Sequence, residues 1–330
     1  MTNKIVNVAV AVMHYQCQFL LGFRHASQHQ GNRYEFIGGK IETFENPQQA
    51  LIREVYEEIG CDISQNLLRK MGVIRHDYPE KTVALHIFAI AVSQAQFDSL
   101  QGGQGKEGQA ITWVSKDALL NKKYSLPEAN ARILDWLCLP DTIFISQSLD
   151  KFEHEHAWVD YYVNHLPKNG YIYIRLQTDP QQAVPVIQAW QKKRNDTTSL
   201  IQYATFLALA SDNNKIIHLN HQQLMGVDFA QLPKEPRYFA SCHDKNSLSR
   251  INELAKTHRV MGCFLSPVNA TPTHPKQGGI GWQAFGALAD YSDVPVFALG
   301  GVGLADMSMA WQHNAMGVAG IRLLAPKPVI

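Results

Sequence analysis

The sequence predicts an α/β protein of two domains, residues 1–140 and residues 141–330. Three observations lead to this prediction. The chain has 330 residues, more than one core of ordinary size holds. The first 140 residues mix strand-like runs with two helical stretches, whereas the remainder alternates short β-branched runs with amphipathic segments. Eight alternations of this kind predict parallel strands with helical crossovers, closed into a (β/α)8 barrel of the TIM type.

The predicted barrel strands are short runs of five to nine residues with apolar or β-branched side chains. They are residues 142–146, 171–176, 199–204, 215–220, 237–243, 260–268, 294–300 and 317–323. The helices predicted between them include residues 158–165, 183–193, 247–258 and 307–313.

Composition narrows the function classes. Hydrophobic residues make up 45% of the chain and charged residues 18%, which is typical of a packed globular protein. The formal net charge of +1 offers no field that would hold a nucleic-acid polymer, so we expect a small nucleotide at most.

The apolar stretch at residues 6–13 is too short for a signal peptide or a membrane span. The five scattered cysteines form no metal or disulfide spacing. We therefore expect a cytoplasmic protein with reduced thiols.

The most informative stretch is GGKIETFENPQQALIREVYEEIGC, residues 38–61. It follows the spacing G-x5-E-x7-R-E-U-x-E-E-x-G-U, in which U is a bulky apolar residue. The positions that match are Gly39, Glu45, Arg53, Glu54, Glu57, Glu58 and Gly60, and Cys61 departs from the pattern. Seven such coincidences by accident are improbable by several orders of magnitude, since each residue type occurs at roughly one position in fifteen.

Physical chemistry explains this spacing. Asn46 and Pro47 are a typical helix start and Gly60 a typical helix stop. On that helix the three glutamates at positions 54, 57 and 58 share one face, where they repel one another unless a cation lies among them. Their hard oxygen atoms suit Mg²⁺, or Mn²⁺. A solvated acidic face is the alternative for a bare E-x-x-E-E, but the glycine loop, Glu45 and Arg53 in register favour a metal site.

This motif resembles that of the Nudix hydrolases. The resemblance implies an α/β/α sandwich with a mixed sheet and a metal-dependent hydrolase acting on acid anhydrides. It also implies that Glu54, Glu57, Glu58 and the carbonyl of Gly38 hold metal, that Glu54 is the base for the attacking water, and that Glu45 and Arg53 pair to brace the loop.

Residues 4–137 further resemble the MutT branch, which removes 8-oxoguanine triphosphates from the nucleotide pool and so prevents mutation. The segments that carry this likeness are residues 32–42, 105–109, 112–113 and 126–130. The likeness implies 8-oxo-dGTP as substrate, with 8-oxo-dGMP and pyrophosphate as products. The implied substrate contacts are Arg24, His29, Glu35, Phe36, Ile37, Gly38, Lys81 and Asn130, and Glu107 is the implied extra metal ligand.

The alternatives for these residues stay open at this point. The Asn130 amide offers the donor and acceptor that face purine O6 and N7–H, but it also suits the cap of a helix over residues 131–137. Phe36 suits ordinary core as well as a base contact, and Glu107 suits an exposed loop. Ile37 and Lys81 stand where the branch usually has proline and arginine, which alters the expected base pocket.

The second half resembles thiamine phosphate synthase, most clearly after residue 215. Residues 217–219, 266–273, 298–302 and 317–320 carry the likeness, which implies a phosphate site at Gly300, Gly301, Gly317 and Gly320. The family's glutamine, arginine and lysine on the second strand appear as Tyr173, Arg175 and Gln177. Its metal-binding aspartate is replaced by Gln223 or another uncharged residue, and its loop lysine by His274, with Lys276 nearby.

We therefore predict a catalytically degenerate barrel that binds at most a phosphorylated ligand. His218 and His243 at strand ends suit either packing or ligand contact. Two alternatives to the leading function remain. One is that the first half hydrolyses a thiamine-related pyrophosphate. The other is that the barrel is a ligand-sensing or scaffolding module.

Overall fold

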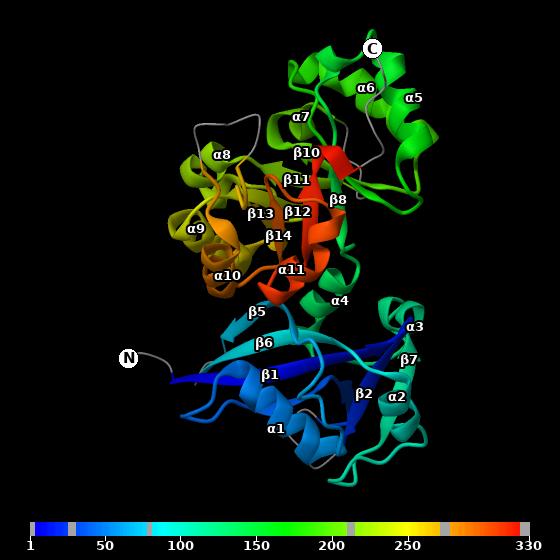
Figure 1. Cartoon of the computed structure of the whole chain (residues 1–330), viewed down its shortest axis with the longest axis vertical. Coiled ribbons are helices and arrows are strands. Elements are labelled where there is room, and N and C mark those ends of the chain that lie inside the picture. The colour runs from blue at the N-terminus through cyan, green and yellow to red at the C-terminus, as the bar shows by residue number, and fades with distance from the viewer. Residues whose placement is uncertain (1–3, 26–30, 78–80, 210–214, 271–277, 324–330) are drawn as a thin grey trace. The chain divides into compact units, whose positions relative to one another are not determined.

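The computed structural model describes residues 4–25, 31–77, 81–209, 215–270 and 278–323, apart from the side chain of Lys4. The chain divides into two units, Met1–Cys138 and Leu139–Ile330, close to the boundary predicted from the sequence. Within the described ranges, no helix is both long enough and apolar enough to cross a membrane. Figure 1 colours the two units from blue to cyan and from green to red.

The first unit is built on a mixed seven-stranded sheet, as predicted. Its strands are β1 (Lys4–Tyr15), β2 (Gln18–Arg24), β3 (Arg33–Glu35), β4 (Ile37–Lys40), β5 (Arg69–Asp77), β6 (Lys81–Ala91) and β7 (Ile111–Ser115). The main order is β3-β2-β1-β6-β5, while β4 pairs with β1 and β7 with β2. Only the β1–β6 pair is parallel among the described pairings.

Four helices and one 3-10 turn accompany this sheet: α1 (Pro47–Ile59), α2 (Gln94–Ser99), α3 (Lys116–Leu120), η1 (Glu128–Asn130) and α4 (Ala131–Leu137). The apolar side of α1 contributes Ala50, Leu51, Val55 and Ile59 to the core, as its periodicity predicts. They pack against inward residues of β1 such as Ala9 and Ala11. The opposite side of α1, which carries the glutamates, therefore faces away from this core.

The second unit is a closed barrel of eight parallel strands, and all eight predicted strands are confirmed. They are β8 (Thr142–Ile145), β9 (Tyr171–Ile174), β10 (Thr198–Gln202), β11 (Lys215–Leu219), β12 (Arg237–Cys242), β13 (Arg259–Leu265), β14 (Val296–Leu299) and β15 (Gly317–Gly320). β15 pairs with β8 and closes the ring.

The helices around the barrel are α5 (Glu155–His165), α6 (Pro180–Lys193), α7 (Tyr203–Ala208), α8 (His221–Gly226), α9 (Lys245–Thr257), α10 (Gly281–Tyr291) and α11 (Met307–Gln312). Four further one-turn 3-10 segments are η2 (Leu149–Lys151), η3 (Phe229–Gln231), η4 (Leu304–Asp306) and η5 (Ile321–Leu323).

Successive side chains of each strand point alternately outward and into the barrel, so every second residue fills the barrel interior. Ile217 and Leu219 on β11 pack outward into the core beneath the helices, so His218 between them points inward. Inside, the rings of Phe239 and Phe264 lie 4.6 Å apart, and that of Phe297 is 5.8 Å from Phe239. Aromatic side chains therefore occupy the barrel interior next to this histidine.

Candidate functional site

The acidic helix α1 begins where its sequence predicts. Asn46 accepts hydrogen bonds from the amides of Gln48 and Gln49, at 3.0 and 2.9 Å, and the Gln49 side chain accepts from the Asn46 amide. Gly60 ends the helix with φ of 71°, a left-handed conformation that glycine adopts without steric cost. These two caps fix the register of the three glutamates.

Arg53 joins the glycine loop to the helix. Its guanidinium makes a two-pronged pair with Glu45, with Nε and Nη2 at 2.7 and 2.8 Å from the carboxylate oxygens, and Nη2 also donates to the Lys40 carbonyl. The predicted Arg53–Glu45 brace is therefore confirmed. The hydrogen bond from Arg53 lowers the pKa of Glu45 to about 2. The pKa of Arg53 is raised above its usual range, chiefly by Glu45 and further by Glu54 and Glu57.

The same guanidinium also reaches the acidic face. Arg53 Nη1 lies 2.9 Å from Glu54 Oε1 and 2.9 Å from Glu57 Oε2. In the part of the chain that the structure describes, no three histidine, cysteine or acidic side chains are grouped so that they could hold a metal ion. The arrangement thus differs from the predicted cluster, because the cation among these carboxylates is the arginine itself.

Two glycines bring the loop against the helix. A Cβ on Gly39 would lie 2.2 Å from the carboxyl carbon of Glu54, so only glycine leaves room for that carboxylate. Gly38 has φ of 148°, and a Cβ there would lie 2.1 Å from the Ala9 carbonyl oxygen. The Gly38 amide hydrogen-bonds to the Glu58 carboxylate. The loop therefore seats two of the three helix glutamates.

The pKa of Glu58 is raised by its surroundings. Burial raises its pKa to about 8, and the charges of Glu35, Glu107 and Glu54 raise it further, in that order. The hydrogen bond from Gly38 opposes this rise. Three carboxylates, from α1, from β3 and from the loop at residues 105–109, are therefore close enough to repel the charge of Glu58.

The loop that carries Glu107 is fixed to the helix by its backbone. The Lys106 amide and the Gln109 side chain both donate to the carbonyl of Glu58, at 2.7 and 3.2 Å. The Lys106 ammonium lies 3.8 Å from the centre of the Tyr56 ring. Glu107 itself is exposed, as an ordinary loop residue would be, yet this attachment holds it near Glu58.

Arg24 and Glu35 form an ion pair between two neighbouring strands. Arg24 Nε forms an ion pair with the Glu35 carboxylate at 2.5 Å between β2 and β3. Phe36 and Ile37 are both buried, with 4% and 1% of their surfaces exposed. The Ile37 side chain belongs to the core beneath α1, so only the backbone of Ile37 is left to contact a ligand. Lys81 is the first residue of β6. His29 lies outside the described residues.

Asn130 does not cap the following helix with its side chain. It is 6% exposed, its backbone is helical, and its amide group makes no capping hydrogen bond to α4. The alternative interpretation as a helix cap is therefore wrong. The Tyr34 amide donates to the Ser125 carbonyl at 2.9 Å, which holds the segment before Asn130 against β3.

Two aromatic residues near this contact were missed from the sequence. The rings of Tyr34 and Tyr124 meet edge to face with centroids 4.9 Å apart, and Phe23 lies 5.0 Å from Tyr34. Tyr124 lies four residues after the end of a short helix, and its position shortly before Leu126-Pro127 was the available signal.

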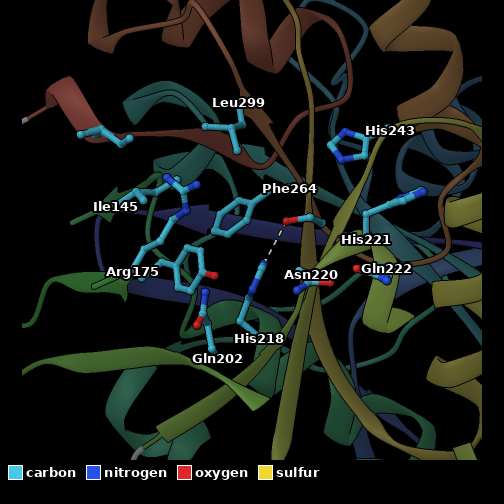
Figure 2. Close-up of a pocket in the computed structure, with 13 residues that line it drawn as sticks. Ile145, Arg175, Gln202, His218, Asn220, His221, Gln222, His243, Phe264 and Leu299 are labelled. Carbon is cyan, nitrogen blue, oxygen red and sulfur yellow. Dashed lines mark hydrogen bonds between the residues drawn. The ribbon is translucent and has the colours of Figure 1, made fainter. Parts of the chain in front are cut away.

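A second cavity, of about 540 Å³, opens at the carboxyl ends of the barrel strands (Figure 2). Ile145 and Leu299, the last residues of β8 and β14, line it. Its polar wall includes Arg175, Gln202 and His218. Among the described residues that line it, none is acidic, which fits the predicted loss of magnesium ligands.

One part of the predicted phosphate site is misplaced. Gly317 begins β15, so it lies at the end of the barrel opposite the cavity, and a Cβ there would lie 2.0 Å from the Asp141 carbonyl oxygen. Glycine stands at position 317 because the neighbouring backbone packs too closely for a side chain. Gly320 ends the same strand, and Gly300 and Gly301, with φ of 95° and 65°, follow β14. These three are near the cavity, but their neighbours Leu299 and Ile321 form its wall.

Some of the other barrel residues singled out in the sequence line the cavity, and others do not. Arg175 lines the cavity, whereas Gln177, with φ of 55°, is exposed. The Gln223 side chain accepts a hydrogen bond from the amide of Asn220, the residue that caps the start of α8. His274 and Lys276 lie outside the described residues. His243 and His218 both line the cavity, and His243 Nδ1 also lies 2.8 Å from the Ser266 carbonyl oxygen.

Comparison with known proteins finds a matching family model for each unit. Residues 8–136 match the family described as NUDIX domain, and residues 181–324 match the family described as Thiamine monophosphate synthase.

Three curated relatives match the first unit. An 8-oxo-dGTP diphosphatase from Proteus vulgaris is 42% identical over 67 residues, which span 20% of this chain and 58% of that protein. An 8-oxo-dGTP diphosphatase from Haemophilus influenzae is 30% identical over 136 residues, 41% of this chain and 92% of that protein. A CTP pyrophosphohydrolase from Escherichia coli is 28% identical over 132 residues, 40% of this chain and 90% of that protein. The chain therefore belongs, through its N-terminal unit, to the Nudix hydrolases that act on acid anhydrides, and its C-terminal unit is a barrel similar to thiamine phosphate synthase.

Proposed function

We propose that the Nudix unit hydrolyses 8-oxo-dGTP to 8-oxo-dGMP and pyrophosphate in the presence of a divalent metal ion, Mg²⁺ or Mn²⁺. By removing the oxidised nucleotide it protects the pool used for DNA synthesis. The observation that carries the proposal is that Glu35, Glu107 and Glu54 lie near enough to Glu58, beside the glycine loop, to raise the pKa of Glu58 by their charges. The relatives named 8-oxo-dGTP diphosphatase support the choice of substrate.

The donor set fits a hard divalent cation. Carboxylates that repel one another at Glu58 are stabilised when a positive ion lies among them, and oxygen ligands suit magnesium and manganese. Glu54, Glu57, Glu58 and Glu107, with the carbonyl of Gly38, would hold the ion. When bound, it would polarise phosphoryl oxygens and neutralise charge on the leaving group.

The chain's own residues supply the rest of the hydrolysis. A carboxylate oxygen of Glu54 accepts a proton from the attacking water as the water oxygen bonds to phosphorus. The anhydride bond between the α- and β-phosphates breaks, and pyrophosphate leaves with its electron pair. Arg53 holds Glu54 through Nη1, and Gly39 leaves space for the carboxylate. The glycine loop is thus a positioning element for the base.

Base selection is assigned to Asn130. Its amide has both a donor and an acceptor, which match the O6 and N7–H of 8-oxoguanine. Its burial without a capping role supports a ligand contact. Phe36, also buried, would pack beside the base, while the pair Arg24–Glu35 borders this region.

Steady-state kinetics on the full chain tests the proposal. We expect kcat/KM for 8-oxo-dGTP to exceed that for dGTP and CTP, and Asn130→Ala to reduce the preference over dGTP by about tenfold or more. Asn121→Ala, a change at an exposed asparagine of the same unit, is the matched control and should leave the preference unchanged. Equal rates on 8-oxo-dGTP and dGTP would remove oxidised-base selectivity. Faster hydrolysis of hydroxymethylpyrimidine pyrophosphate or thiamine diphosphate would favour the thiamine-related alternative.

The barrel is proposed to be catalytically degenerate. A cavity without acidic lining residues has no carboxylates to hold the magnesium that a departing pyrophosphate needs. Formation of thiamine phosphate from its pyrimidine and thiazole precursors by the full chain would contradict this.

A further inference from the structure

Asn130, to which base selection is assigned, lies at the end of an irregular segment. Residues 121–127 join α3 to the one-turn segment η1 and form no helix or strand. A segment of this kind has many accessible conformations, and ordering each of its residues costs backbone entropy. Asn130 is nevertheless 6% exposed, and its backbone amide donates to the Pro127 carbonyl at 2.9 Å. Contacts with another part of the unit therefore hold this segment in place.

Two contacts with β3 attach the segment to the sheet. The Tyr34 amide donates to the Ser125 carbonyl at 2.9 Å, and the Tyr34 and Tyr124 rings meet at an interplanar angle of 88° with centroids 4.9 Å apart. Ser125 is exposed, so water competes for its carbonyl and this hydrogen bond adds little on its own. An edge-to-face pair sets the positive edge of one ring on the negative face of the other, which favours one orientation. The ring contact is thus the more selective part of the attachment.

Tyr34 is itself fixed within the sheet. It pairs with Phe23 across the β2–β3 ladder, and the two rings lie 5.0 Å apart. Phe36, which is proposed to pack beside the base, follows Tyr34 by two positions and is buried. The contact between Tyr34 and Tyr124 therefore joins the strand that leads into Phe36 to the segment that leads into Asn130. The two residues proposed to contact the base are connected through this pair.

We propose that Tyr34 and Tyr124 form an aromatic clasp that holds Asn130 where its amide selects the base, so that both tyrosines are positioning residues for oxidised-base selectivity. This inference rests on the base selection assigned to Asn130. A nucleotide that needs the ordered segment binds with an apparent affinity reduced by the fraction of molecules in which the segment is ordered. An edge-to-face pair changes such a population by a factor of about 2–10.

Steady-state kinetics of Tyr124→Leu in the full chain tests the clasp. We expect KM for 8-oxo-dGTP to rise about 3–10-fold, with kcat changed by less than about twofold, because saturating substrate selects the ordered segment. The values for dGTP should change by less than about twofold, since dGTP has no N7–H for Asn130 to recognise. The preference for 8-oxo-dGTP should therefore fall about 3–10-fold.

A double-mutant cycle shows whether the two rings act together. Tyr34→Leu should lower the preference as Tyr124→Leu does, and the double variant should lose little more, because either substitution breaks the same contact. Tyr124→Phe keeps the ring and should keep the parent preference. Tyr15→Leu is the matched control, since it removes a ring contact of 4.4 Å with Phe97 in the same unit, and it should leave the preference unchanged.

Hydrogen exchange without nucleotide gives a second measurement that does not depend on catalysis. The Tyr34 amide, which donates to Ser125, should exchange about 3–10-fold faster in Tyr124→Leu and at the parent rate in Tyr15→Leu and Tyr124→Phe. A merely structural role of Tyr124 would lower the melting temperature without this local change. Circular dichroism confirms that each variant is folded.

Three outcomes would overturn the clasp. They are a folded Tyr124→Leu variant with the parent preference, unchanged exchange of the Tyr34 amide in that variant, and a Tyr124→Phe variant that loses as much preference as Tyr124→Leu. Equal rates on 8-oxo-dGTP and dGTP in the parent chain would instead remove the proposed function, and this inference with it. The two failures are distinguishable, because one is seen in the parent chain and the other only in the variants.

Discussion

The acidic face of α1 and the mouth of the barrel differ in the sign of the charge that their side chains present. Around Glu58 several carboxylates converge, whereas the described lining of the barrel cavity has no acid and one arginine. An anionic ligand approaches the first surface only when a cation offsets the carboxylates, and it meets the second directly. The charge of the side chains at each surface therefore predicts whether an anionic ligand needs a metal ion to bind there.

Arg53 and Arg175 show the same difference between the two units. Arg53 is committed to three carboxylates and a backbone carbonyl, so it serves the structure of the loop and helix. Arg175 has no ion pair with a described residue and lines a cavity. The same side chain is thus a positioning residue in one unit and a candidate ligand contact in the other, and its partners make the difference.

The largest expected effect comes from Glu54→Gln. The amide keeps the shape of the side chain but cannot accept the proton of the attacking water, so turnover should fall by about 10²–10⁴-fold. The melting temperature should change little, because Arg53 keeps its two-pronged bond to Glu45. Single-turnover hydrolysis of the proposed nucleotide and circular dichroism measure the two effects.

Asp98→Asn is the matched control for this substitution. It removes one exposed negative charge from α2 of the same unit, away from the glycine loop, and should preserve turnover. Near-normal hydrolysis by Glu54→Gln would displace Glu54 from its role as base.

Gly39→Ala should have the next largest effect, and it acts on position rather than on chemistry. The added Cβ would overlap the Glu54 carboxyl group, whose side chain moves more easily than backbone. A carboxylate displaced by about 1 Å can cost about 100-fold in rate, so we expect turnover to fall by about 10–100-fold. Thermal unfolding should stay within about 2 °C of the parent chain.

Gly38→Ala provides the contrast. There the added Cβ would meet a backbone carbonyl oxygen, that of Ala9, and φ of 148° is unfavourable for alanine. We expect the melting temperature to fall by more than about 5 °C. A Gly39 variant that loses stability as much as the Gly38 variant, or keeps full turnover, would show that Glu54 is not seated by this glycine.

Periodic and local features were predictable from the sequence. The eight barrel strands, the Asn46 and Gly60 caps and the Arg53–Glu45 pair were all expected, because alternation and spacing along the chain determine them. The helices α7, α8 and α10 were not predicted by their residue ranges, although parallel neighbouring strands require a crossover at each of these places.

Features that depend on distant segments were harder to predict. Spacing suggested metal among the glutamates, but only the fold reveals that Arg53 reaches Glu54 and Glu57. Gly317 was assigned to a phosphate site because glycine-rich ends of barrel strands often bind phosphate, whereas its place at the start of β15 explains it by packing. The buried state of Asn130 likewise depends on contacts outside α4.

The smallest expected effect concerns the arginine brace of the barrel, Arg194 with Asp196, which is remote from the cavity lining. Arg194 Nε and Nη2 lie 2.7 and 3.0 Å from the Asp196 oxygens, and its nitrogens also donate to the carbonyls of Leu166 and Pro167. The hydrogen bond from Arg194 lowers the pKa of Asp196 to about 2 from an ordinary 3.8. The carboxylate form is therefore favoured by folding.

A lowered folded-state pKa adds stability that is present above pH 4 and is lost as the pH falls toward 2. Asp196→Asn should thus lower the melting temperature of the barrel by about 2–4 °C at pH 7, equivalent to about 1 kcal/mol at a partly exposed pair. The gap should close between pH 4 and pH 2, because the parent chain loses the same contribution there. Hydrogen exchange at residues 166–170 measures this locally, and a gap that persists at pH 2 would assign it to lost packing instead. Hydrolysis should be unchanged, since the acidic face does not use this pair.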